Sequence, residues 1–175
     1  MSRNLSLGPK WSHEMYEFLR AEGIDLFAWV PDGGHKVPIA RSLADQDAIS
    51  VPLTREDEGV ALLAGAHLGQ MKGVLLLQSS GVGNCINMLS LTAHGRFPLV
   101  MLVTMRGTYG ENNPWQIPMG QGARPALEAM GVHCFEVDYP DEVVPTVQAA
   151  MLMAHRSDRA VAVLLSQKLI GAKKM

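Results

Sequence analysis

Three consecutive acidic residues, Glu56-Asp57-Glu58, stand immediately before a long segment rich in Ala and Leu. Carboxyl groups in such a place can do either of two jobs. In the first turn of a helix they accept hydrogen bonds from free backbone N–H groups and interact favourably with the helix dipole. Beside a bound ligand, a carboxyl group can instead donate or accept a proton. The residue types alone favour the capping role.

A second candidate is the segment Ser79-Ser80-Gly81-Val82-Gly83-Asn84, which follows a very apolar run. Glycines at a strand-to-helix turn let backbone N–H groups approach a ligand, and phosphate groups bind at such turns. The segment lacks both the lysine of a P-loop and the G-x-G-x-x-G pattern. We therefore predict a ligand-binding turn in which phosphate is only weakly indicated.

Two further segments combine turn residues with polar side chains. Pro31-Asp32-Gly33-Gly34-His35 follows an apolar run, and its glycines permit backbone angles that other residues avoid. The polar segment 105–121 contains Arg106 and Gln116, and it is too long for a simple connection. Segments of this kind are typical of functional loops, so both are candidate sites.

The histidines and cysteines give weaker signals. The six histidines show neither the spacing of metal ligands nor a pairing with a nucleophilic cysteine. Cys85 and Cys134 lie far apart in apolar stretches, which favours core positions and a reducing compartment over a disulfide. No G-x-S-x-G motif of a hydrolase occurs. We expect no metal site formed by this chain.

Short apolar runs alternate with segments of helical periodicity, a pattern typical of βα units that build a parallel sheet. We predict an α/β fold: one three-layer domain over residues 1–175, with a six-stranded, mostly parallel sheet flanked by helices. The predicted strands are residues 25–30, 48–52, 73–78, 98–104, 133–137 and 160–165. The predicted helices are residues 10–21, 35–43, 55–69, 85–93, 123–130 and 141–155.

This arrangement places all four candidate segments at one edge of the sheet. Each of them follows a predicted strand, and ligands of open parallel sheets bind beyond the carboxyl ends of the strands. We therefore expect the acidic cluster and the three other segments to lie close together.

Composition excludes several classes of protein. The chain has 175 residues, of which 47% are hydrophobic and 18% are charged, so it can bury one core and is not disordered. Its net charge of −2, without a basic cluster, argues against nucleic acid as a partner. No apolar run reaches the ~20 residues that span a bilayer, and no signal peptide is evident. We expect a cytoplasmic protein that binds no membrane.

Taken in order, the candidate segments resemble the pyrimidine-binding (PYR) domain of thiamine diphosphate enzymes, and most of all the sulfopyruvate and phosphonopyruvate decarboxylases. The resemblance spans residues from about 11 to about 165. It rests on Val30-Pro31-Asp32-Gly33, Thr54-Arg55-Glu56-Asp57-Glu58-Gly59, Ala64-Gly65-Ala66-His67-Leu68, Gln78-Ser79-Ser80-Gly81-Val82-Gly83-Asn84, Met105-Arg106-Gly107 and Pro118-Met119-Gly120.

The resemblance implies a catalytic role for one of the three acids. In this family, an acidic residue nine positions before the Gly of an Ala-Gly pair hydrogen-bonds N1′ of the cofactor's aminopyrimidine, and counting back from Gly65 gives Glu56. That contact stabilises the tautomer whose 4′ nitrogen takes the proton from the thiazolium C2. Asp57 and Glu58 would then only cap the helix.

The same matching implies two groups of contacts. The cofactor would be lined by Pro31, Glu56, Ser79, Ser80, Gly81 and Asn84. The substrate would be lined by Asp32, Gly33, His35, Arg106 and Gln116. For each residue other than Glu56, the alternative is a turn residue that satisfies its own backbone.

Two departures from the family pattern leave the substrate open. Trp115-Gln116 stands where relatives often have a Gln-His pair, and Gly33-Gly34-His35 differs from the pattern expected of a strict sulfopyruvate enzyme. The resemblance is thus compatible with a different 2-oxo acid or with carboligation.

The resemblance also implies a partner. Thiamine diphosphate enzymes hold the diphosphate and Mg²⁺ through a second, PP domain with a Gly-Asp-Gly and a downstream Asn, and this sequence contains no Gly-Asp-Gly. A separate PP-type β subunit in an α2β2 or larger complex would complete the site. The expected function is the PYR-type α subunit of a heteromeric 2-oxo acid decarboxylase with a sulfopyruvate- or phosphonopyruvate-like substrate. The alternative is a non-catalytic, flavodoxin-like module that binds a phosphate ligand or regulates another protein.

Overall fold

The computed structural model describes residues 8–172. Its strands are β1 (Ile24–Trp29), β2 (Ile49–Pro52), β3 (Lys72–Gln78), β4 (Leu99–Thr104), β5 (His133–Val137) and β6 (Ala160–Leu165). They form one sheet in the order β2-β1-β3-β4-β6-β5, and every neighbouring pair is parallel. The predicted α/β fold is confirmed, with a sheet that is parallel throughout.

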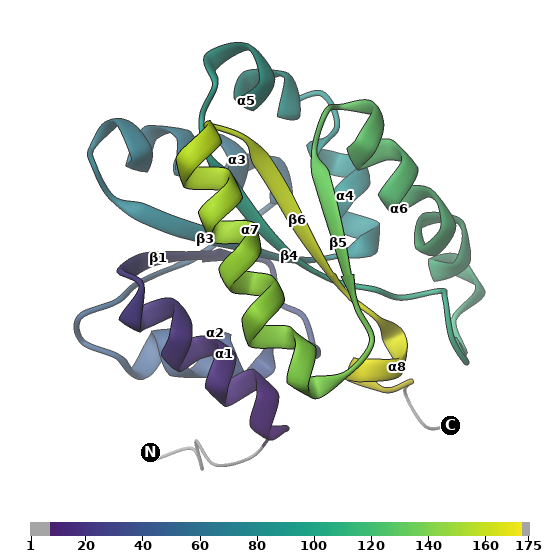
Figure 1. The fold of residues 1–175 in the computed structure, drawn as a ribbon. Coiled ribbons are helices and arrows are strands. Elements are labelled where there is room, and N and C mark those ends of the chain that lie inside the picture. The colour runs from purple at the N-terminus through teal and green to yellow at the C-terminus, as the bar shows by residue number, and fades with distance from the viewer. Residues whose placement is uncertain (1–7, 173–175) are drawn as a thin grey trace.

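Helices connect successive strands, because parallel neighbours cannot be joined by a tight turn, and one further helix precedes β1 and another follows β6. They are α1 (Lys10–Ala21), α2 (Lys36–Ala44), α3 (Glu56–Leu68), α4 (Ser79–Cys85), α5 (Leu89–Gly95), α6 (Ile117–Ala129), α7 (Val143–Ser157) and α8 (Gln167–Ile170), with short 3₁₀ turns η1 (Pro114–Gln116) and η2 (Pro140–Glu142). Figure 1 shows them on both faces of the sheet. None of the helices in the described range is long and apolar enough to cross a membrane.

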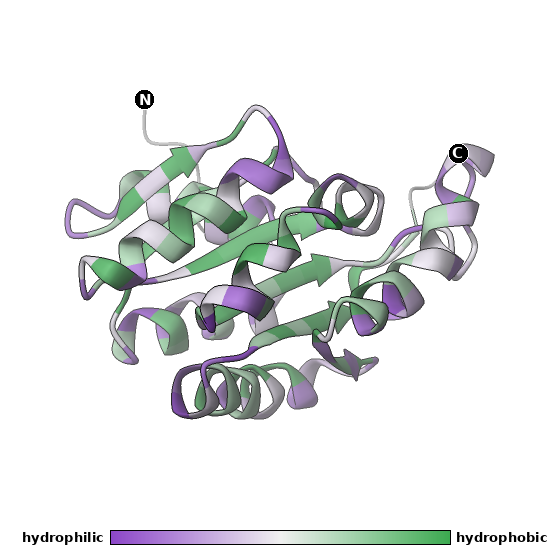
Figure 2. Ribbon diagram, turned by 90° about the horizontal axis from the view of Figure 1, so that it is seen from above, coloured by the Kyte–Doolittle hydropathy of each residue, from purple (hydrophilic) through white to green (hydrophobic). Residues whose placement is uncertain are grey.

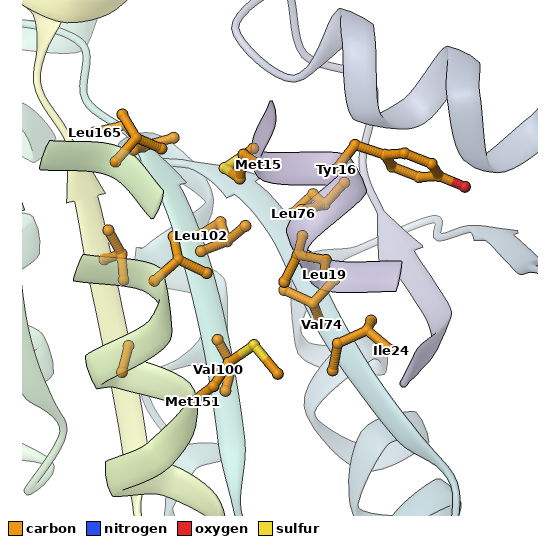
Figure 3. Packing of buried hydrophobic residues seen from close by; sticks show 14 of the residues in the cluster. Met15, Tyr16, Leu19, Ile24, Val74, Leu76, Val100, Leu102, Met151 and Leu165 are labelled. Carbon is orange, nitrogen blue, oxygen red and sulfur yellow. The ribbon is translucent and has the colours of Figure 1, made fainter. Parts of the chain in front are cut away.

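The strands feed two separate cores, because successive side chains point to opposite faces of a sheet. On one face, Met15 and Leu19 of α1 pack with Leu76 and Leu102 of the sheet, and all four are fully buried (Figure 3). Helix α7 closes the same core. In Figure 2 the hydrophobic strands run between the two helical layers, whose surfaces carry most of the hydrophilic residues.

The second core lies between the sheet and helices α3 to α6. Val60 and Leu63 of α3, Val82 of α4 and Leu127 of α6 are buried in it. The helices that carry the acidic cluster and the Ser79–Asn84 segment therefore share one face of the sheet. This common packing fixes the position of one segment relative to the other.

The predicted loop 105–121 is shorter than expected, because η1 and α6 begin inside it. Pro118 lies in the first turn of α6, where its missing N–H costs nothing. Gly120 has no side chain because a Cβ there would lie 2.7 Å from the carbonyl carbon of Gly107. Gly120 therefore allows α6 to pack closely on the loop after β4. The prediction that residues 117–121 form a loop is wrong, because they lie in α6.

Candidate functional site

The candidate segments lie together at the carboxyl ends of β1 to β4. Side-chain hydrogen bonds link the segment after β3 to the acidic cluster and to the segment after β4. Another side-chain hydrogen bond links the segment after β1 to the end of β4. The structure therefore brings the four predicted segments into one site.

The three acids at the start of α3 take different positions. Glu58 Oε2 accepts hydrogen bonds from the backbone N–H groups of Thr54 and Arg55, at 2.9 and 3.4 Å. Asp57 pairs with the Arg55 side chain at 3.1 Å. Glu58 thus caps the helix and Asp57 forms a surface ion pair. Glu56 has neither role.

Glu56 is nearly buried, with 8% of the residue exposed. Its Oε2 accepts a hydrogen bond of 2.8 Å from Nδ2 of Asn84, the second-to-last residue of α4. No described residue donates to Oε1, and no described cation pairs with the carboxyl group. The result is a carboxyl group held in place by one neutral donor, with one oxygen left for a further partner.

The predicted turn Ser79–Asn84 is instead helix α4. Gly81 lies inside this helix, and a Cβ there would lie 2.5 Å from the carboxyl carbon of Glu56 and closer still to Oε1. The glycine thus makes room for the Glu56 side chain. The prediction of a turn over this segment is wrong, because the segment is helical and Gly81 serves close packing on Glu56. The cofactor contacts predicted for Ser79, Ser80, Gly81 and Asn84 stay predictions.

Ser79 and Ser80 open α4 but differ in surroundings. The Oγ of Ser79 is buried, accepts a hydrogen bond of 3.0 Å from the backbone N–H of Arg106, and donates weakly to the Arg106 carbonyl at 3.4 Å. Ser80 is half-buried. Ser79 therefore fixes the chain after β4 to the chain after β3.

The segment after β1 is fixed through Asp32. Its Oδ2 accepts hydrogen bonds from Oγ1 of Thr104, at 2.7 Å, and from the backbone N–H of Gly34, at 3.1 Å. A Cβ at Gly34 would lie 2.6 Å from Cγ2 of Thr104, so only glycine fits there. Pro31 and Gly33 of the same segment are exposed at the surface.

His35 does not reach the surface of the site. The residue is 0% exposed, and its Nε2 lies 2.8 Å from the carbonyl of Leu102 and 3.2 Å from that of Leu77. Both partners are acceptors, so Nε2 carries the proton. Burial lowers the pKa of His35, which keeps the ring neutral. The structure thus makes His35 a tie between the first loop and strands β3 and β4, and the predicted substrate contact does not fit this position.

Arg106 is held by a carboxylate that the sequence did not single out. Its Nε and Nη2 donate to the two oxygens of Glu111 at 2.7 and 2.6 Å. The side chain of Gln167 in α8 donates to the same carboxylate at 2.9 Å, and its Oε1 accepts from the backbone N–H groups of Thr108 and Tyr109. These hydrogen bonds tie the segment after β4 to α8.

Gln116 and Trp115 lie in η1, at the far end of that segment. Gln116 is half-buried, and its Oε1 has no hydrogen-bond partner among the described residues. A Cβ at Gly107 would lie 2.6 Å from the Gln116 carbonyl carbon, and Gly107 has φ +76°. Trp115 is 83% exposed.

Within residues 8–172, no group of three or more His, Cys, Asp or Glu is placed to bind a metal ion.

Comparison with known families identifies the family of the chain. The family model of the thiamine pyrophosphate enzyme, N-terminal TPP binding domain, matches residues 10–133, which is more than half of the sequence. The chain belongs to the thiamine pyrophosphate enzyme family. Thiamine pyrophosphate and thiamine diphosphate are two names of one cofactor.

Three relatives of this thiamine pyrophosphate enzyme domain are sulfopyruvate decarboxylases or their alpha subunits. Sulfopyruvate decarboxylase subunit alpha of Methanococcus maripaludis is 34% identical over 88% of this chain and 93% of its own length. The subunit alpha of Methanothermobacter thermautotrophicus is also 34% identical, over 88% and 94%. Sulfopyruvate decarboxylase of Methanosarcina acetivorans is 32% identical over 92% of this chain but only 41% of its own length.

The fold of this domain also occurs in a solved enzyme. It superposes on 2-oxoglutarate:ferredoxin oxidoreductase from Magnetococcus marinus with a TM-score of 0.71, over 91% of this chain and 29% of that one. The two sequences are only 16% identical, so the likeness concerns the fold.

Both cysteines of this thiamine pyrophosphate enzyme domain are free, and Cys85 is buried while Cys134 is half-buried. Burial raises the pKa of the Cys85 thiol to about 12 and that of Cys134 to about 11. Neither thiol is poised to act as a nucleophile, in agreement with the prediction of core residues.

Replacing Glu111 with Gln is expected to destabilise the chain by about 2 kcal/mol near neutral pH, because Arg106 then lacks a charged partner. The hydrogen bonds from Arg106 lower the pKa of Glu111 from 4.5 to about 2. A carboxyl group whose pKa falls on folding contributes stability above pH 4.5, and this contribution is lost as the pH falls toward 2. Thermal unfolding of the variant should therefore depend less on pH in that window than unfolding of the wild type.

Glu128 provides the control for that measurement. It forms an ion pair with Arg124 at 2.8 Å, and both side chains are almost half exposed. Exposed pairs contribute little, so Glu128→Gln should change stability by less than about 0.5 kcal/mol. Equal losses in the two variants would contradict the role given to Glu111.

Proposed function

We propose that this chain is the PYR-type α subunit of a heteromeric thiamine diphosphate-dependent 2-oxo acid decarboxylase. The observation that carries the proposal is the Glu56 carboxyl group, which is nearly buried, held by Asn84 and placed at the ligand-binding edge of a thiamine pyrophosphate enzyme domain. The relatives named sulfopyruvate decarboxylase subunit alpha support a small 2-oxo acid with a second acidic group as the substrate.

The residues present fit the pyrimidine half of thiamine diphosphate. Glu56 Oε1 accepts no hydrogen bond from the described residues and can pair with a ring nitrogen. Arg106, by contrast, is already paired with Glu111, and the sequence has no Gly-Asp-Gly. We therefore assign the diphosphate and Mg²⁺ to a separate PP-type β subunit with a Gly-Asp-Gly and a downstream Asn.

When bound, thiamine diphosphate supplies the nucleophilic carbon and the electron sink for the loss of CO₂. The task of this chain is to hold a proton at the carboxyl group of Glu56 and to release it there. Near exclusion of water strengthens the electrostatic interactions of that carboxyl group. Arg106 donates to Glu111 through Nε and Nη2, so its remaining Nη1 is the group that would contact the 2-oxo acid, with Asp32 held beside it by Thr104.

An exposed aromatic residue in the segment after β4 supports an assembly with a partner. Trp115, in η1 of that segment, is 83% exposed. Aromatic side chains are enriched at protein interfaces. In the relative from Methanosarcina acetivorans, the matched region is 41% of a longer chain, which leaves room in that chain for a second domain. We expect an α2β2 or larger complex in the cytoplasm.

Titration calorimetry tests the proposal. We expect the full chain alone to bind thiamine diphosphate negligibly, and its complex with a β subunit encoded by the neighbouring reading frame to bind it tightly and only with Mg²⁺. The β subunit alone is the control. Tight binding of thiamine diphosphate or inorganic phosphate by the isolated chain would contradict the proposal.

The flavodoxin-like alternative is not favoured. It needs the Ser79–Asn84 segment to surround a phosphate group, but this segment is a helix whose glycine at position 81 faces the Glu56 carboxylate. A carboxylate at that place repels a phosphate.

A further inference from the structure

Asn84 contacts the acid of the site, although the sequence comparison placed it on the cofactor. Its side-chain Nδ2 lies 2.8 Å from Oε2 of Glu56, across 28 residues of sequence. We propose that Asn84 is a positioning residue that acts on the reaction through Glu56. This inference rests on the proposed function of Glu56 and adds to it a device that orients the carboxyl group.

Two positions of α4 together confine the Glu56 side chain. Residues 81 and 84 are three apart and therefore lie on the same side of the helix. Gly81 leaves the space that the carboxyl group occupies, since a Cβ there would lie 2.5 Å from its carbon atom. Asn84 holds Oε2 by a hydrogen bond, and no described residue donates to Oε1, which is left for a second partner.

The charge of the donor matters as much as its place. A lysine or arginine at position 84 would form an ion pair that opposes protonation of the carboxyl group. An aspartate would repel it. The neutral amide of Asn84 orients Glu56 by a single charge-assisted hydrogen bond, and this leaves the carboxyl group able to take and release a proton.

The test variant is Asn84→Asp, studied in the complex with the β subunit. It keeps the shape of the side chain but replaces the N–H donor with a second carboxylate about as near as the amide was. We expect the affinity for thiamine diphosphate and kcat to fall by about ten- to a hundredfold at neutral pH. The loss should shrink as the pH is lowered, because two adjacent carboxyl groups share a proton that rebuilds the hydrogen bond.

Asn87→Asp is the matched control. Asn87 follows α4, is exposed, and makes no side-chain hydrogen bond to Glu56. The control adds the same charge to the same surface, so it separates a general electrostatic effect from the loss of this contact. We expect it to change cofactor affinity less than about twofold.

Thermal unfolding of the full chain gives a readout that needs neither cofactor nor partner. Asn84→Asp should lower Tm by about 3–6 °C at neutral pH and by less at acidic pH. Combining Glu56→Gln with Asn84→Asp reverses donor and acceptor, because the glutamine amide now donates to the aspartate. The double variant should recover the wild-type Tm in the isolated chain and remain inactive in the complex.

The outcomes separate the two proposals. The positioning role is overturned if Asn84→Asp matches Asn87→Asp in affinity, kcat and Tm, or if the double variant recovers no stability. Recovery of Tm in the double variant, with no thiamine diphosphate bound by the wild-type complex, would overturn the proposed function and would leave the Asn84–Glu56 pair established.

Discussion

Glu56→Gln is expected to lower kcat of the assembled decarboxylase by about a hundred- to ten-thousandfold, the range that a positioned proton-transfer group contributes. The glutamine has the shape of the glutamate, and its carbonyl oxygen can still accept the hydrogen bond from Asn84 Nδ2. The fold and the fit of the side chain over Gly81 should therefore survive. What disappears is the group that holds and releases the proton. Single-turnover measurement of CO₂ release with a saturating 2-oxo acid checks this prediction.

The two neighbouring acids are the natural controls. Glu58 accepts backbone N–H groups at the helix start, and a glutamine carbonyl can replace it in that role. Asp57 forms a surface pair whose contribution is small. Glu58→Gln and Asp57→Asn should each retain activity within about threefold and cost less than about 1 kcal/mol of stability. A Glu56→Gln complex that keeps most of its activity would refute the catalytic role.

The sheet could be predicted because its strands are continuous apolar runs buried on both faces. Val74 to Leu77 and Val100 to Val103 are such runs, and buried parallel strands have this pattern. Helix α1 begins and ends where the sequence predicts, since its apolar positions recur at helical spacing and Gly23 follows it. The local sequence pattern is sufficient to predict an element where tertiary packing and intrinsic propensity favour the same structure.

Helix α4 could not be predicted in the same way. Glycine is a poor helix former, so Gly81 and Gly83 favour a turn on propensity alone. The contact between Gly81 and Glu56 joins residues 25 positions apart, and no local pattern reports it. The same holds for the start of α6, where Gly120 packs against the loop after β4. Tertiary contact overrides local preference at both places.

The location of the candidate site was predictable, whereas the role of its acid stays a prediction. Parallel strands bring the four segments to one edge, and the family resemblance selects Glu56 from its neighbours. Thr104, Glu111 and Gln167 were missed, although each lies at or just after the carboxyl end of β4 or β6. Because Glu111 lies in the polar segment after β4, its position in the sequence could have marked it as a candidate site residue. His35 misled because a histidine in a glycine-rich loop resembles a ligand-binding residue, while its burial depends on β3 and β4.

Gly81→Ala should damage the site almost as much as loss of the acid itself. A methyl group at position 81 would lie 2.5 Å from the carboxyl carbon of Glu56, which real side chains do not tolerate. The Glu56 carboxyl group must then rotate away from Asn84 or push α3 from α4. Misplacement of a reacting group by about 1 Å costs roughly a hundredfold in rate. We expect kcat of the complex to fall by at least about that factor, with weaker binding of thiamine diphosphate.

Gly83→Ala makes this prediction specific. Gly83 is exposed in the same helix, and a methyl group there would meet only Met119, at an ordinary distance of 3.6 Å. Alanine is the better helix former by about 1 kcal/mol, so this variant should unfold at a slightly higher temperature with unchanged activity. At position 81 the methyl group meets the flexible end of Glu56, so the side chain can move aside and the loss falls on activity more than on stability. If both alanine variants were equally active, the space above Gly81 could not be what positions Glu56, because the two substitutions differ only in what the new methyl group touches.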